Sequence, residues 1–273
     1  MMMKKTRLMV DGHVHIYDCY NLETFFNTAV KNLEGVYHTL YANGSPFEIM
    51  LLLTEAKIND FFSRFKEKGE YAADSGIRFL ETGEDVSIAL VKNQKRLCTL
   101  VKGRQIVTKE NLEVLALGSA QTISDGQPIE TVLEKLIEKQ ELAVLAWGFG
   151  KWLFQRGKII ERVMEKYRSP YLLLGDNSGR PGFWPVPRAF KKARKLQVPI
   201  INGSDPLPFA GEEYKAGTYG FSIEGEFNEN QPARSLRDLL ATLEPDIDYF
   251  GKRDNTAAFL KRQSKIYLKK YIK

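Results

Sequence analysis

The chain has 273 residues, of which 43% are hydrophobic and 27% charged, a composition that is typical of a folded protein and excludes wholesale disorder. The formal net charge of +6 is concentrated in residues 252–273, here called the tail, where eight Lys and Arg and one Asp give +7. The remaining residues carry −1, so they offer no clear nucleic-acid-binding surface, and the net charge does not indicate one spread over the whole molecule.

The first part of the chain alternates short apolar strands with amphipathic helices. Residues 8–10 predict a buried strand that runs into a polar loop, and residues 21–33 carry apolar side chains at helical spacing up to Gly35, a typical helix stop. Residues 47–53 form a continuous apolar run, which indicates a strand buried on both faces. A second helix is predicted over residues 58–68, where three Phe side chains share one side.

The middle of the chain has a different pattern. Residues 77–118 contain short alternating segments separated by polar turns, which predict a small antiparallel β meander set inside the larger fold. Strand–helix alternation then resumes. The helices are predicted over residues 128–139, 157–167 and 187–196, and the strands over residues 142–147, 171–174 and 198–201.

Repeated strand–helix units imply a mostly parallel sheet with helices outside it, as an open sheet or a closed barrel. The sequence contains no internal repeat and no low-complexity linker. We therefore expect residues 1–273 to form a single α/β domain that includes the meander.

Two of the three histidines stand directly after the first predicted strand, as His13 and His15. On an extended segment, this spacing places both imidazoles on one face, with Asp11 on the same side. Two imidazoles that converge on one point suit a divalent metal, and zinc, manganese and iron all accept such ligands. The alternative is a loop that contains two histidines without a shared role. The third histidine, His38, is expected to be structural.

Polar residues also follow the later predicted strands, at the edge where α/β folds place functional groups. The residues that come shortly after such strands are Glu55, Lys151, Asp176 and Asp205. Asp176 and Asp205 stand in turn-like segments, so turn formation alone also explains them. Lys151 and Arg180 are ordinary surface charges by default, and in a pocket they would hold a phosphate or carboxylate group.

Five segments resemble, in order, the motifs of the PHP family, the polymerase and histidinol phosphatase domain among the metal-dependent hydrolases. The segment Asp11-Gly-His-Val-His15 matches the motif D-x-H-x-H, and residues 51–56 match the motif T-D-H. Residues 101–118 match P-G-x-E and the strand after it. Residues 145–148 match A-H-P, and residues 198–207 match G-S-D-A-H. The resemblance implies a distorted, TIM-like (β/α)7 barrel that holds two or three metals and hydrolyses phosphate esters.

The chain departs from the family pattern at four ligand positions. Residues that cannot supply an anionic or imidazole ligand occupy them, namely Ala56, Gln105, Trp147 and Leu207. Glu55 also replaces the Asp of the second motif. A full trinuclear centre is therefore not expected.

Three ligands of the family pattern are retained, namely His13, His15 and Asp205. Such a set can hold one metal with open coordination positions, which is a workable arrangement for hydrolysis. The resemblance therefore implies a reduced site with a single zinc, manganese or iron ion.

Two functional hypotheses follow. In the first, the chain is a one-metal hydrolase that acts on a phosphate ester or another small anionic molecule. Asp176 or Glu55 would transfer protons beside a catalytic Lys151. Lys151 would also hold the anionic substrate, together with Arg180 and Trp147. In the second hypothesis, a barrel without catalysis, and without a metal, serves as a binding or regulatory module. The four lost ligands favour the second hypothesis, and the three retained ones favour the first.

The tail is predicted to form a basic amphipathic helix over residues 252–273, and its N-x-A-x-x-L pattern resembles the helix that closes many metal-dependent hydrolase barrels. Its apolar stripe consists of Phe259, Leu260, Ile266, Tyr267 and Tyr271. Three roles remain open. The helix packs on the body with a solvated basic face, it binds an acidic partner or an anionic membrane surface, or it binds nucleic acid.

Composition also bears on the cellular compartment. Cys19 and Cys98 are too few for a disulfide framework and lack the spacing of metal ligands, which favours a reducing cytoplasm. Asp11 and His13 interrupt the first apolar residues, so no signal peptide is expected. No segment approaches the roughly 18 consecutive apolar residues of a membrane-spanning helix. Nothing in the sequence predicts the oligomeric state.

Overall fold

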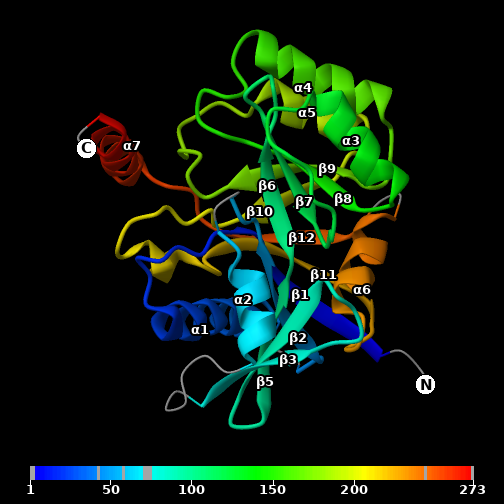
Figure 1. Cartoon of the computed structure of the whole chain (residues 1–273). Coiled ribbons are helices and arrows are strands. Elements are labelled where there is room, and N and C mark those ends of the chain that lie inside the picture. Colours follow the sequence, from blue (N-terminus) through cyan, green and yellow to red (C-terminus); the bar gives the residue numbers. More distant parts are fainter. Residues whose placement is uncertain (1–3, 42–43, 57–58, 70–75, 243–244, 272–273) are drawn as a thin grey trace.

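A computed structural model describes residues 4–41, 44–56, 59–69, 76–242 and 245–271 (Figure 1). The strands are β1 (Lys4–Val14), β2 (Phe47–Leu53), β3 (Ile77–Glu81), β4 (Ser87–Lys92), β5 (Lys95–Val101), β6 (Gly103–Val107), β7 (Glu113–Leu117), β8 (Leu142–Ala146), β9 (Leu172–Asn177), β10 (Ile200–Gly203), β11 (Tyr219–Phe227) and β12 (Ile247–Gly251). The helices are α1 (Leu22–Leu40), α2 (Phe61–Lys68), α3 (Ile129–Glu138), α4 (Gln155–Lys166), α5 (Arg188–Lys195), α6 (Pro232–Leu240) and α7 (Thr256–Tyr271), with a short 3-10 helix at Glu212–Lys215.

The strands form two mixed sheets. Sheet A has seven strands in the order β12-β11-β1-β2-β5-β4-β3, and sheet B has five in the order β10-β9-β8-β7-β6. The α/β class is therefore confirmed, but the predicted TIM-like barrel is wrong, because neither sheet closes on itself. Instead, β3 and β12 form the edges of sheet A, and β6 and β10 form those of sheet B.

The segment predicted as one inserted meander is divided between the two sheets. β3, β4 and β5 pair antiparallel in sheet A, whereas β6 and β7 pair antiparallel in sheet B. The chain changes sheets at Lys102, between β5 and β6. These strands therefore widen two separate sheets, and they do not form a unit added to a closed barrel.

Three hydrophobic layers hold the sheets and helices together. One core lies between α1, α2 and sheet A, and a second lies between sheet B and α3, α4 and α5. The third lies between the two sheets and includes residues of both, such as Leu52 and Val144, with α6 at its border. Figure 1 shows this arrangement, with α3, α4 and α5 at the top and α1 and α2 at the bottom.

Alternation along the strands explains why their sequences are apolar throughout. In β9, Leu172 and Leu174 pack under the helices of sheet B, whereas Leu173 points into the layer between the sheets. In β2, Leu51 faces the helix side and Met50 faces the sheet side in the same way. Both β2 and β9 therefore have two buried faces, as their continuous apolar runs predict.

Several helix boundaries differ from the sequence prediction, and those of α1 and α2 have local causes. α1 continues past Gly35 to Leu40, because Tyr37 is buried in the first core and packing extends the helix beyond the glycine. α2 begins at Phe61, where the Asp60 side chain accepts a hydrogen bond from the Ser63 backbone. Residue 58, where this helix was predicted to start, lies outside the described residues.

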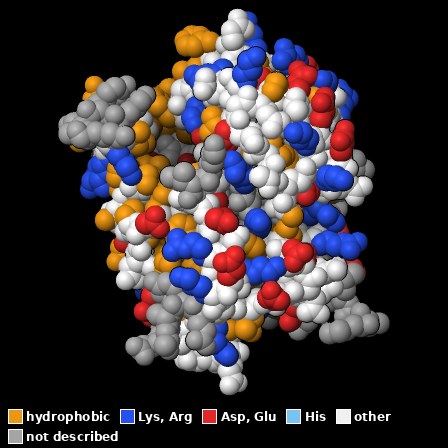
Figure 2. Space-filling view, viewed as in Figure 1, with side chains coloured by type: hydrophobic (Ala, Val, Ile, Leu, Met, Phe, Trp, Pro, Cys, Tyr) orange, Lys and Arg blue, Asp and Glu red, His pale blue; other side chains and the backbone are white. Residues whose placement is uncertain are grey.

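Residues 256–271 of the tail form α7, and most of the described side chains of its predicted apolar stripe are exposed. Phe259 and Arg262 are buried, but Leu260, Ile266 and Tyr267 of the predicted apolar stripe are exposed. The side chain of Tyr271, and residues 272 and 273, lie outside the described part. Figure 2 shows hydrophobic side chains gathered beside α7, while basic and acidic side chains intermix over the body. Within the described ranges, no helix combines the length and apolarity needed to cross a membrane.

Candidate metal centre

The end of β1 is irregular, and this irregularity positions both histidines. β1 pairs in parallel with β2 as far as Asp11, and its register shifts before Val14. On the other side, Gly203 of β10 lies against His13, and a Cβ on this glycine would fall 2.2 Å from the His13 backbone nitrogen. Glycine is therefore required for β10 to approach β1 this closely. The loop after β10 consequently lies beside the histidines.

Asp11 connects three segments underneath the site. It is fully buried and accepts backbone hydrogen bonds from His13 (3.3 Å), Ser204 (2.8 Å) and Gly217 (2.8 Å). Burial raises the pKa of this carboxyl to about 6, although these hydrogen bonds favour the charged form. Asp11 therefore supports the site from below, as a positioning residue.

His13, His15 and Asp205, here called the triad, converge at this place. The two Nε2 atoms of His13 and His15 are 3.0 Å apart, and each lies 3.5 Å from Asp205 Oδ1. Both imidazoles are buried. Asp205 has a left-handed backbone, with φ of 49°, and its N–H donates to the His13 carbonyl at 2.8 Å. Asn177 Nδ2 donates to Asp205 Oδ2 at 2.9 Å and to the Trp147 carbonyl at 2.9 Å.

The chemistry of the triad fits a divalent metal. One ligand atom from each residue lies within 4.8 Å of the other two. Burial and the neighbouring His13 lower the pKa of His15 to about 4, so its imidazole is neutral and able to bind a metal at physiological pH. Burial opposes ionisation of Asp205, but its electrostatic interactions with the two imidazoles and with Arg262 outweigh burial and lower the pKa of this carboxyl. Imidazole nitrogens and one carboxylate suit zinc, manganese or iron.

A cavity of about 340 Å³ opens on the triad. His15 and Asp205 line it, together with the predicted residues Lys151 and Trp147. Its other lining side chains include Tyr17, Gln105, Glu113, Phe149, Asn177, Leu207, Arg262, Gln263 and Ile266. The cavity therefore contains both cationic and acidic groups next to the candidate metal ligands.

A polar network at one wall of the cavity includes Glu113, which the sequence did not single out. Glu113 Oε1 pairs with Lys151 Nζ and accepts a hydrogen bond from Gln105 Nε2 at 3.0 Å. Gln105 and Glu113 lie on the paired strands β6 and β7, which explains how their side chains meet. This wall of the cavity therefore holds a carboxylate, supplied by Glu113 next to Gln105.

Arg262 is the second residue that sequence reasoning missed, because it was counted only among the basic residues of the tail. Its side chain is buried, with Nη1 3.1 Å from Asp254 Oδ2 and Nη2 2.8 Å from the Asp205 carbonyl oxygen. α7 therefore places one of its positive charges directly behind the triad.

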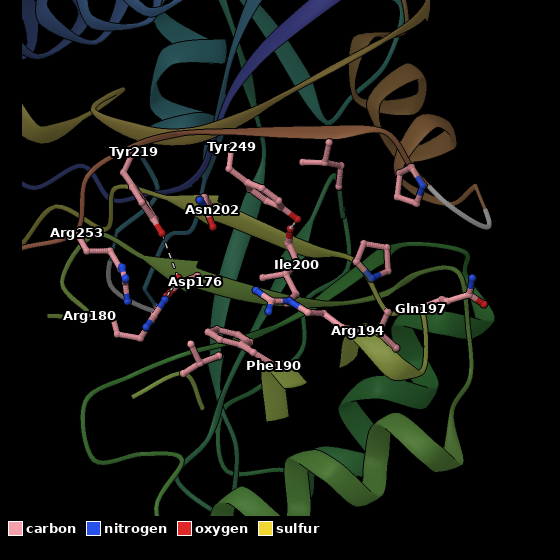
Figure 3. A pocket seen from close by; sticks show the side chains of 15 residues that line it. Asp176, Arg180, Phe190, Arg194, Gln197, Ile200, Asn202, Tyr219, Tyr249 and Arg253 are labelled. Carbon is pink, nitrogen blue, oxygen red and sulfur yellow. Dashed lines mark hydrogen bonds and ion pairs between the residues drawn. The ribbon is translucent and has the colours of Figure 1, made fainter. Parts of the chain in front are cut away.

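Two predicted residues, Asp176 and Arg180, lie on the other face of sheet B. They form a buried pair in which Arg180 Nε is 2.7 Å from Asp176 Oδ1, and Tyr219 also donates to Asp176 Oδ2 at 3.1 Å (Figure 3). Neither residue lines the cavity of the triad, and both line another one. Alternation along β9 explains this separation, because Asn177 points to the triad and the preceding Asp176 therefore points away.

Glu55, the other predicted proton-transfer residue, is held at the start of α2. Its Oε1 accepts the backbone N–H groups of Phe61 (2.5 Å) and Phe62 (3.1 Å). Burial raises the pKa of Glu55 to about 7, against the effect of these two hydrogen bonds. Glu55 is absent from the residues that line the cavity of the triad, and among the described residues its carboxylate contacts this helix terminus.

Comparisons with known proteins show a fold but no family. No family model matches the chain, and no curated protein matches it. The solved structures that it resembles include PsfC from Pseudomonas syringae PB-5123, with a TM-score of 0.58 and 13% identity over 99% of this chain and 100% of that one. At this identity the likeness shows a shared fold alone.

A second solved structure is Endonuclease Q in complex with a 27-mer duplex substrate that has an abasic lesion at the active site. Its TM-score is 0.46, with 12% identity over 88% of this chain and 56% of that one. A likeness at this level carries no conclusion about the present chain.

Proposed function

We propose that the chain is a metal-dependent hydrolase that acts on a phosphate ester, or another small anionic molecule, with one divalent ion. The observation that carries the proposal is the convergence of His13, His15 and Asp205 at the base of a cavity. The five segments that resemble the PHP motifs support it, because they include these same three residues. A divalent ion held there would supply a Lewis acid and an activated water, which is how such ions serve hydrolases.

The cavity walls supply charges suited to an anionic substrate. Lys151 Nζ lies in the cavity wall, held by Glu113, and Arg262 adds a second positive charge behind Asp205. Lys151 would bind an anionic group of the substrate, and Trp147 would form an apolar wall beside it. Lys151 and Trp147 would therefore bind the substrate, as the sequence hypothesis proposed.

Proton transfer is assigned differently from the sequence hypothesis. Asp176 and Glu55 are engaged on other faces of the fold, with Arg180 and with the start of α2. Among the described residues, Glu113 is the carboxylate that lines the cavity without belonging to the triad. Glu113 Oε1, bonded to Lys151 and Gln105, would therefore accept or release the proton.

A second candidate function is a binding module without catalysis. It is favoured by the indole of Trp147 and the alkyl side chain of Leu207, which line the cavity where the PHP pattern has metal ligands. Such a module would bind an anionic molecule at the triad without hydrolysing it.

Elemental analysis of the purified protein tests the metal. We expect on the order of one zinc, manganese or iron ion per chain, and its loss from the double variant His13→Ala, His15→Ala. The matched control is His38→Ala, which removes the exposed histidine of α1 and should leave the metal content unchanged. The absence of stoichiometric metal, even after supplementation with these ions, would contradict the proposal.

Activity separates the two candidates once metal is found. Phosphate monoesters, diesters and amides would be assayed with the metal-loaded protein and with Lys151→Met. A hydrolase should turn over at least one class, and loss of Lys151 should raise KM by about tenfold, since one charge-assisted contact is lost. Saturable binding with no turnover of any class would favour the binding module.

A further inference from the structure

A second and larger cavity, of about 630 Å³, lies where the two sheets end side by side. It is lined by Ile200 and Asn202 of β10, the edge strand of sheet B, and by Ile247 and Tyr249 of β12, the edge strand of sheet A. Tyr249 Oη donates across the gap to the Ile200 carbonyl at 2.7 Å. We call this space the seam cavity. Its volume is in the range of small-molecule sites.

The seam cavity concentrates positive charge. Three arginines line it, Arg180, Arg194 and Arg253, against the single carboxylate of Asp176. Figure 3 shows their side chains directed at the space around Asp176 and Ile200. With one acid against three bases, the lining carries a net charge of +2. A phosphate monoester carries about −1.5 to −2 at neutral pH, so its charge complements this lining.

Two of these arginines have hydrogen-bonding capacity left over. Arg180 is only 5% exposed; its Nε and Nη2 bind Asp176, but its buried Nη1 has no partner among the described residues. Arg253 Nη1 is likewise buried without a partner in the described part of the chain. Buried polar groups are nearly always hydrogen-bonded, so two guanidinium nitrogens in one cavity without a partner among the described residues indicate a missing acceptor.

The position of Arg253 is fixed by its neighbour in the chain. The backbone N–H of Asp254 donates to the Ser178 carbonyl at 2.8 Å, and the Asp254 carbonyl accepts from Gly182 at 2.9 Å. Both partners belong to the segment after β9, which also carries Arg180. The two arginines are therefore preorganised on two backbone segments that are hydrogen-bonded to each other.

The remaining lining suits an organic group attached to the anion. The Phe190 ring lies 5.5 Å from Arg180 Cζ, and Val186 and Ile247 line the same cavity. Asn202 is buried and points its amide into the space, as Figure 3 shows. A bare ion would leave this apolar wall uncovered.

We propose that the seam cavity binds a small organic phosphate, with the phosphate on Arg180, Arg194 and Arg253 and the organic group against Phe190 and Ile247. Arginine is suited to this task because its planar guanidinium offers paired N–H donors to phosphate oxygens. No residue lines both this cavity and that of the triad. The site is therefore independent of the proposed hydrolase function, and either proposal can fail alone.

Calorimetric titration of the full chain with phenyl phosphate tests this site. We expect saturable binding that weakens about tenfold or more in Arg194→Gln and in Arg253→Gln, because each loses a charge-assisted contact. Lys195→Gln is the matched control, since it removes the neighbouring positive charge of α5 outside the cavity and should leave the affinity unchanged. Inorganic phosphate should bind more weakly than phenyl phosphate, because it leaves the apolar wall empty.

Four results would overturn the proposal. They are the absence of saturable binding at millimolar phenyl phosphate, equal losses in Lys195→Gln and the two arginine variants, equal affinity for the two probes, and loss of binding in the variant His13→Ala, His15→Ala. The last result would place the phosphate at the triad. Circular dichroism spectra of all variants would establish that each is folded.

Discussion

The two faces of β9 and β10 carry opposite chemistries within one residue of each other. Towards the layer between the sheets, Asn177 supports a set of imidazoles and one carboxylate, which suits a cation. Towards the helices, Asp176 and Asn202 line a cavity in which arginines predominate, which suits an anion. Strand alternation alone separates the two sites. Neighbouring polar residues at a strand end therefore need not belong to one site.

The sites also differ in how closely the sheets approach. At the triad, Gly203 lets β10 lie directly against His13, so the site is enclosed. At the seam, β10 and β12 are both edge strands, and a tyrosine hydroxyl bridges them. The open side of the fold, where a barrel would close, thus holds the larger of these two cavities.

The largest effect is expected from the buried pair of the seam cavity. Asp176→Asn should destabilise the protein by about 3–5 kcal/mol, since it leaves the buried charge of Arg180 uncompensated. The double variant Asp176→Leu, Arg180→Met should be about as stable as the unmutated protein, because apolar side chains replace the whole pair. Urea denaturation measures both free energies of unfolding.

The same double variant sharpens the comparison between the sites. It should lose phenyl phosphate binding and keep its metal, because the triad lies on the other face of β9. Unchanged phosphate affinity in this variant would make the arginine–aspartate pair purely structural. Loss of metal would show that the two faces are not independent.

Much of the fold could be predicted from the sequence, because the spacing of apolar residues within each helix and strand is a local signal. The apolar runs of β2, β8 and β9 report two buried faces, which the layered arrangement confirms. β11 and β12 were not predicted: Gly220 and Gly225 interrupt the apolar pattern of β11, and β12 has only Phe250 fully buried. Barrel closure depends on how edge strands such as β12 pair, which no local pattern encodes.

Some residues of the candidate site could likewise be predicted from the sequence, and others could not. His13, His15 and Asp205 could be named because they stand in the last residues of a strand or shortly after its end, and the structure brings them together. The separate location of Asp176 could also have been read from the sequence, by extending the alternation of Leu173 and Leu174 two residues further. Arg262 had no such signal, because its place behind Asp205 depends on where α7 docks.

Glu55 provides the next largest expected effect, as a pH dependence of stability. Its pKa is about 7 in the folded protein against an ordinary value of 4.5, so the folded state holds the proton more tightly. The stabilisation is complete below pH 4.5 and is lost as the pH rises to 7, by at most about 1.4 kcal/mol per pH unit. Relative to Glu55→Gln, the unmutated protein should therefore gain stability as the pH falls from 8 to 5.

Denaturant unfolding of both proteins at several pH values measures this difference. The metal content of Glu55→Gln should equal that of the unmutated protein, because Glu55 contacts the start of α2 and lies outside the cavity. A stability difference that is independent of pH would contradict the raised pKa. A large loss of metal in Glu55→Gln would instead mean that Glu55 contributes to the metal site.

The smallest effect is expected at Asn177. It tests whether the two faces of β9 and β10 act independently. Asn177→Ala removes the hydrogen bond that orients Asp205 Oδ2, so metal affinity should fall about tenfold without loss of the ligands themselves. Asn202→Ala is a matched control, because Gly203 pairs with Asn177 in the sheet and Asn202 points to the seam cavity instead. It should weaken phenyl phosphate binding and leave the metal affinity unchanged.

Competition with a chelator of known affinity measures the metal affinity of both variants. An equal loss of metal affinity in Asn177→Ala and Asn202→Ala would mean that the two faces are coupled through the strands.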